Sequence, residues 1–63
     1  MLTINEMEIL KSALEGDIAR QKDYLDEMSE QGGSDVRFEM WLDESQRLLK
    51  KVSLKLFDMK AKA

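Results

Sequence analysis

Apolar residues recur at steps of three and four along two segments of the chain, which is the spacing of one face of an α-helix. We expect a first helix over about residues 4–31 and a second over about residues 35–60. Gln21 and Ser45 are polar members of the two stripes, which are expected to face each other. The predicted hairpin core consists of Met7, Leu10, Leu14, Ile18, Leu25 and Met28 from the first segment and Phe38, Trp41, Leu48, Val52 and Leu56 from the second.

A glycine pair, Gly32-Gly33, separates the two segments, and Ser34-Asp35 follows it in a chain without proline. Glycine readily adopts the left-handed conformation that ends a helix, so we expect the first helix to stop near Gln31 with Gly32 just beyond it. A short connection between two long helices folds them against each other. The predicted fold class is therefore all-α: an antiparallel two-helix hairpin, with residues 1–63 as its single domain. Because two helices alone cannot enclose a core, the hairpin is expected to associate into a larger helical assembly.

Start signals are present for both helices. Thr3 and Glu6 have the spacing of a capping box, in which each side chain accepts a hydrogen bond from the other residue's backbone N–H. Ser34 is expected as the N-cap of the second helix. Trp41, the single tryptophan, is expected to anchor the core near the turn. Two acid-first pairs at i,i+4 spacing are expected on the surface: Asp43/Arg47 and Asp58/Lys62.

The composition removes most routes to chemistry. The chain has neither cysteine nor histidine, so disulfides, thiolate nucleophiles and the usual zinc ligands and general base are absent from its side chains. Neighbouring acids such as Asp26 and Glu27 point about 100° apart on a helix and do not converge on a metal. We predict no enzyme activity and no catalytic, cofactor-binding or metal-binding residue.

Charge is divided unevenly along the chain. The net charge is −3, but residues 1–46 hold twelve acidic and four basic residues, whereas residues 47–63 hold one acidic and six basic residues. Folding the chain back on itself brings the basic tail beside the acidic start of the first helix. No aromatic residues interleave with the lysines in the way that a base-stacking surface would require, so a nucleic-acid partner is not expected. The start of the chain lacks the pattern of a secretory signal, and the high charge is unlike a membrane span, so a cytoplasmic location is expected.

Several apolar residues fall outside the two facing stripes, near the end of the hairpin opposite the glycines. Scattered apolar residues are normal on a protein surface. Here, however, they occur on both segments at the same end, which is typical of a hairpin that packs on a larger helical partner or on a copy of itself. The predicted partner-binding residues are Leu2, Ile9, Ala13 and Gly16 on the first segment and Leu54, Phe57 and Ala61 on the second.

The stretch from Lys22 to Val52 resembles the YscE/PscE/EscE family of small type III secretion proteins. The likeness rests on Gly32-Gly33, a short polar step, an aromatic residue, a tryptophan and the sequence Glu-Ser followed by leucine: Phe38, Trp41, Glu44, Ser45 and Leu48. The resemblance implies a cytoplasmic co-chaperone that pairs with a TPR-like chaperone of the YscG/PscG type. Through this chaperone it would help to keep the needle filament subunit soluble and monomeric before export.

The residues also leave a second reading open. A hairpin with surplus apolar surface can pair with its own copy, giving a homodimeric four-helix bundle with a structural or regulatory role. Such a homodimer is also an expected state of the co-chaperone when no partner is present. Both readings bury apolar residues that the hairpin leaves exposed.

Overall fold

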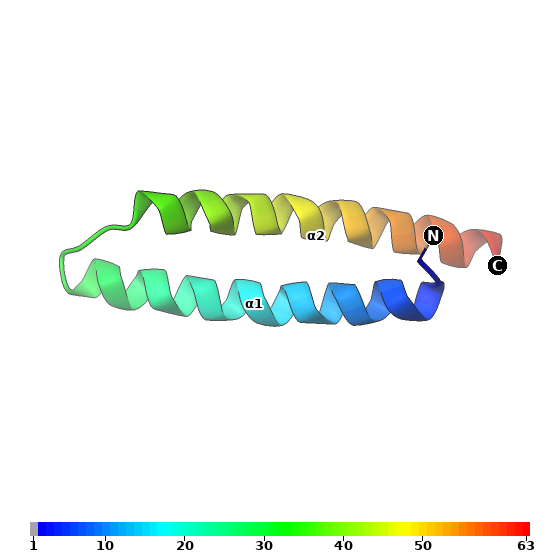
Figure 1. Ribbon diagram of the computed structural model, residues 1–63, viewed down its shortest axis with the longest axis horizontal. Coiled ribbons are helices and arrows are strands. Elements are labelled where there is room, and N and C mark those ends of the chain that lie inside the picture. Colours follow the sequence, from blue (N-terminus) through cyan, green and yellow to red (C-terminus); the bar gives the residue numbers. More distant parts are fainter. Residues whose placement is uncertain (1) are drawn as a thin grey trace.

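The computed structural model describes residues 2–63 as two long helices joined by a short turn (Figure 1). Helix α1 spans Ile4–Glu30 and helix α2 spans Val36–Lys62, each with 27 residues. The helices lie antiparallel, both chain ends are at the same end of the molecule, and the molecule measures 49 × 16 × 15 Å. The predicted all-α two-helix hairpin is confirmed. We call the end with the glycines the turn end and the other the open end.

The first turn of α1 is closed by the expected capping box. The Glu6 backbone N–H donates to Thr3 Oγ1 at 3.1 Å, and the Thr3 backbone N–H donates to Glu6 Oε1 at 3.0 Å. Two backbone donors that the helix itself leaves unpaired are thereby satisfied. The hydrogen bonds from Thr3, first of all the one from its backbone, lower the pKa of the Glu6 carboxyl.

The glycine pair ends α1 as expected. Gly32 has a φ of +78°, in the left-handed region that glycine adopts without steric cost. The Gly32 N–H donates to the Ser29 carbonyl at 3.0 Å, and the Gly33 N–H donates to the Met28 carbonyl at 2.9 Å. These two bonds are those of a Schellman motif, which satisfies carbonyls at the end of a helix. The turn is therefore fixed by backbone hydrogen bonds of its own.

The N-cap of α2 is Asp35, so the prediction of Ser34 is wrong by one residue. The Asp35 carboxylate accepts a hydrogen bond from the Phe38 backbone N–H at 3.0 Å. A carboxylate caps a helix as well as a hydroxyl does, and it adds a favourable negative charge at the positive end of the helix dipole. α2 consequently begins at Val36, and it continues to Lys62, two residues beyond the predicted end.

The core lies along the seam, by which we mean the line of side chains where α1 and α2 pack. Its centre is a cluster of Met7, Val52 and Leu56, with Ile18 buried further toward the turn. Partly buried apolar side chains pack around that cluster: Ile4, Leu10, Leu14 and Met59. The other predicted core residues Leu25, Met28 and Phe38 are half-buried. A single pair of helices covers only the middle of each apolar stripe, so few residues are fully enclosed.

Two predicted core residues lie at the surface instead. Trp41 is 56% exposed and Leu48 is 46% exposed, so the prediction that Trp41 anchors the hairpin core is wrong. The physical reason is angular. Trp41 lies fifteen residues and Leu48 eight residues before the buried Leu56, which rotates them by about 60° and 80° from that residue around the helix. With one partner helix only, this rotation leaves a large side chain beyond the edge of the contact.

A polar layer interrupts the seam at its middle. Gln21 and Ser45, the polar members of the two stripes, are both buried, with exposed fractions of 6% and 8%. No donor within residues 2–63 lies at hydrogen-bonding distance from Gln21 Oε1. An unpaired polar atom in a buried position costs free energy, so this layer weakens the middle of the hairpin.

Candidate interaction surfaces

The predicted partner-binding residues are mostly exposed. Phe57 is 74% and Ile9 64% exposed, the largest values among the exposed bulky apolar residues of α2 and α1 respectively. The others are exposed as well, apart from the half-buried Gly16: Leu2, Ala13, Leu54 and Ala61. Whether these residues bind a partner stays a prediction; the structure establishes that the hairpin itself does not cover most of them.

The structure does not bring the two sets of residues onto one surface. Ile9 follows the buried Met7 by two positions, and Leu54 lies two positions from both Val52 and Leu56. Two residues correspond to about 200° around a helix, so Ile9 and Leu54 both point away from the seam. Because the two helices face each other across the seam, the side chains of Ile9 and Leu54 point in opposite directions. The predicted surface is thus two outward faces, one on each helix, at the open end.

Gly16 lies outside the seam and is not required by the packing of α1 on α2. A Cβ atom added at this position would come nearest to the Arg20 guanidinium, with 3.7 Å to Nη1, which is ordinary van der Waals contact with a flexible side chain. A close approach of α1 to α2 therefore does not explain this glycine.

Ion pairs follow the expected pattern on the surface. Lys60 pairs with Glu8 across the two helices, as expected for a basic tail beside the acidic start of α1. The hydrogen bond and the charge of Lys60 lower the pKa of the Glu8 carboxyl. Three further pairs lie within single helices: Asp43–Arg47 at 3.0 Å, Asp58–Lys62 at 3.1 Å, and Asp17–Arg20, which the sequence analysis did not single out. All are solvent-exposed, so each contributes little to stability.

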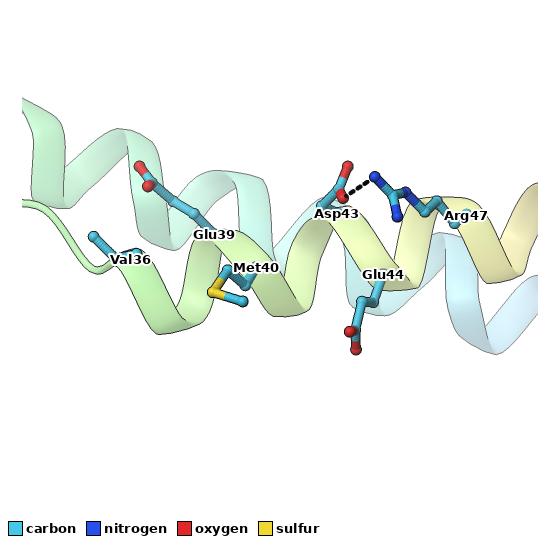
Figure 2. Close-up of a pocket in the computed structure, with 6 residues that line it drawn as sticks. All are labelled: Val36, Glu39, Met40, Asp43, Glu44 and Arg47. Carbon is cyan, nitrogen blue, oxygen red and sulfur yellow. Dashed lines mark ion pairs between the residues drawn. The ribbon is translucent and has the colours of Figure 1, made fainter.

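A groove on the outward side of α2 near the turn was missed from the sequence. Val36 and Met40, both more than 60% exposed, form its apolar part. Figure 2 shows these side chains with the four charged residues that complete the lining, Glu39, Asp43, Glu44 and Arg47, and with the Asp43–Arg47 ion pair. Val36 lies eighteen residues before Leu54, a whole number of helical turns, and so shares its side of α2. The eighteen-residue spacing between Val36 and Leu54 was the feature of the sequence from which this groove could have been predicted.

The second surface missed from the sequence is formed by aromatic residues near the turn. The rings of Tyr24 and Phe38 have centroids 4.4 Å apart, and those of Phe38 and Trp41 are 5.3 Å apart in an edge-to-face arrangement. The Tyr24 hydroxyl donates to Asp35 Oδ2 at 3.3 Å. Desolvation raises the pKa of Tyr24, and the negative charge of Asp35 adds to this effect. Tyr24 on α1 thus contacts Phe38 on α2 and the N-cap residue Asp35, and Phe38 in turn contacts Trp41.

The exposed apolar residues described above are candidate interaction surfaces. Within residues 2–63, no group of three or more acidic, histidine or cysteine side chains is arranged to hold a metal ion. Neither α1 nor α2 has the length and apolar character needed to cross a membrane. Comparison of the chain with protein families, with characterised proteins and with solved structures finds no significant match.

Proposed function

We propose that this protein is an interaction module that docks on a larger helical protein through the open end of its hairpin. The observation that carries the proposal is the exposure of Phe57 and Leu54 on the outward face of α2. Burying one such side chain in an interface is worth about 1.5–3 kcal/mol. Within residues 2–63 the hairpin encloses only four apolar residues, Met7, Ile18, Val52 and Leu56, so additional burial against a partner adds substantially to its stability.

The resemblance to the YscE/PscE/EscE family gives the proposal a specific form. In this form the chain is a cytoplasmic co-chaperone of a type III secretion system, and it binds and stabilises a TPR-like chaperone of the YscG/PscG type. The complex would keep the needle subunit soluble and monomeric before export, with the hairpin touching the subunit little. The two-helix architecture, the glycine turn and the surplus of exposed apolar residues support this assignment.

The opposite directions of the two outward faces restrict the shape of the partner. A flat surface could touch Leu54 or Ile9, but not both. Helical repeat proteins stack into superhelices with extended concave surfaces, and a concave surface can enclose the open end of the hairpin. Enclosure would bury Leu2, which precedes α1, and the predicted residues of both helices: Ile9, Ala13 and Gly16 on α1, and Leu54, Phe57 and Ala61 on α2.

Co-expression tests the proposal. The chain would be produced with each TPR-like protein encoded beside its gene and purified through a tag on that protein, with light scattering to measure the mass of the complex. We expect one of them to retain the hairpin in a 1:1 complex. Phe57→Glu and Ile9→Glu should each abolish retention, because they place a charge in a buried apolar contact.

Met40→Glu is the matched control. Met40 is also an exposed apolar residue on the outward side of α2, but it lies near the turn. This variant should be retained like the wild type. Retention of Phe57→Glu at the wild-type level would show that the open-end surface is wrong. Failure of every TPR-like protein to retain the wild-type chain would reject the co-chaperone function itself.

A further inference from the structure

One broad side of the hairpin carries two rows of residues at seven-residue spacing. Because seven residues nearly complete two helical turns, the members of a row lie on the same side of their helix. Tyr24 and Trp41, one from each row, both contact Phe38, so the rows lie side by side on one face. We call this side the aromatic face, and its rows are Leu10, Asp17 and Tyr24 on α1 and Trp41, Leu48 and Lys55 on α2.

The two exposed residues that depart from the predicted core, Trp41 and Leu48, both belong to this face. They continue the apolar stripe of α2 beyond the part that α1 covers. A helix in a two-helix hairpin needs only a narrow stripe, whereas a helix in a four-helix bundle buries a wider one, since it has two neighbours. The width of the α2 stripe is therefore that of a bundle helix.

Charge is polarised along the hairpin once the chain is folded. The half with the turn, residues 17–46, holds nine acidic and three basic residues, a net charge of −6. The open half, residues 1–16 and 47–63, holds four acidic and seven basic residues, a net charge of +3. Two copies stacked with their turns at the same end would place the acidic halves together. Stacking with the turns at opposite ends places each acidic half against a basic half.

We infer that a second copy of this chain packs on the aromatic face with its turn at the opposite end, forming a four-helix bundle about a two-fold axis perpendicular to the helices. In this arrangement Leu48 lies near the axis and meets the same residue of the second copy. Trp41 lies over the Lys55 position of that copy, where an ammonium group near the indole ring is favourable. The inference does not depend on the proposed function, because it uses a different face.

Light scattering over a concentration series tests the association. The wild-type chain should reach twice its monomer mass of 7.3 kDa. Trp41→Ala should raise the dissociation constant by about 30-fold or more, as expected for loss of a large aromatic contact. Phe57→Glu, a charge on the outward face of α2, should leave the dimer intact. A wild-type chain that stays monomeric up to millimolar concentration overturns the inference, as does a dimer that Trp41→Ala does not weaken.

The folding of Trp41→Ala is checked separately. Because Trp41 is more than half exposed and packs outside the buried cluster, the variant should keep its helical circular dichroism. If that variant unfolds, Leu48→Glu is used in its place. Leu48→Glu should also weaken the dimer, and a dimer that it leaves intact would contradict the inference.

Disulfide cross-linking tests the relative orientation of the two copies. Because the chain has no cysteine of its own, only the introduced thiols can react. Leu48→Cys should give a covalent dimer under mild oxidation, since the two-fold axis passes near this position. Leu54→Cys, on the outward side of α2, should form far less. If Leu48→Cys fails to cross-link while a mixture of Asp17→Cys and Leu48→Cys chains does, the turns lie at the same end and the inferred orientation is wrong.

Discussion

The open half and the turn half of this hairpin are held together by different forces. In the open half, Met7, Val52 and Leu56 form a buried apolar cluster, and Lys60 pairs with Glu8 across the helices. In the turn half, the residues of the seam are polar or half-buried, apart from Ile18. That half is fixed by the backbone hydrogen bonds at the glycines, the Asp35 cap and the aromatic contacts of Tyr24. Local bonds there replace a core, and they leave apolar side chains free for intermolecular contacts.

Removing the centre of the apolar cluster should have the largest effect. Leu56→Ala leaves a cavity at a residue that is 4% exposed, and we expect a loss of about 2–5 kcal/mol in the free energy of unfolding. Leu25→Ala, the same change at a half-buried position in the turn half, should cost clearly less. Urea unfolding followed by circular dichroism measures both. Equal losses would show that the two halves do not differ as described.

The polar layer gives a change of opposite sign. Gln21→Leu removes the unpaired Oε1 atom and adds apolar area to the seam, so unfolding should cost about 1–3 kcal/mol more. Gln46→Leu, at an exposed position of α2, is the control and should have little effect. If Gln21→Leu destabilises the hairpin, the glutamine is satisfied in solution and the seam has no weak layer.

Two glycines provide a matched pair of substitutions to alanine. Gly32→Ala forces a Cβ into the left-handed region and should lower the free energy of unfolding by about 1–2 kcal/mol. Gly16 lies inside α1, where a Cβ meets no obstruction, so Gly16→Ala should raise the free energy of unfolding by about 1 kcal/mol. Thermal and urea unfolding would measure both. Effects of the same sign would contradict the assigned role of one glycine.

Acid should weaken the open half through Glu8. The pKa of its carboxyl is lowered in the folded state, mainly by the hydrogen bond from Lys60, so the folded state binds this proton less readily than the unfolded state. The stabilising contribution is therefore complete above the usual glutamate range, above about pH 5, and is lost as the pH falls through the lowered value. Glu8→Gln should reduce the dependence of stability on pH in that interval. An unchanged dependence would show that this pair contributes nothing in solution.

Most of the fold could be predicted from the sequence because its signals are local. The capping box at Thr3, the glycine turn and the three-and-four spacing each depend on a few neighbouring residues. The N-cap at Asp35 was missed since Ser34 and Asp35 are both good caps and lie next to each other in the sequence. Trp41 was assigned to the core because residue spacing predicts only which side of a helix a side chain lies on. How wide a stripe of that side the partner helix buries depends on tertiary packing. The outward sets around Ile9 and Leu54 were treated as one surface for a related reason: a helical wheel does not show how two antiparallel helices face each other.

Residue-resolved amide hydrogen exchange, measured at low and high protein concentration, tests the contrast between the halves most directly. At low concentration, we predict stronger protection around Val52 and Leu56 than around Trp41. At high concentration, protection should increase from Trp41 to Leu48 as a second copy covers the aromatic face. Uniform protection along α2 at low concentration, or an unchanged exchange near Trp41 at high concentration, would contradict the account.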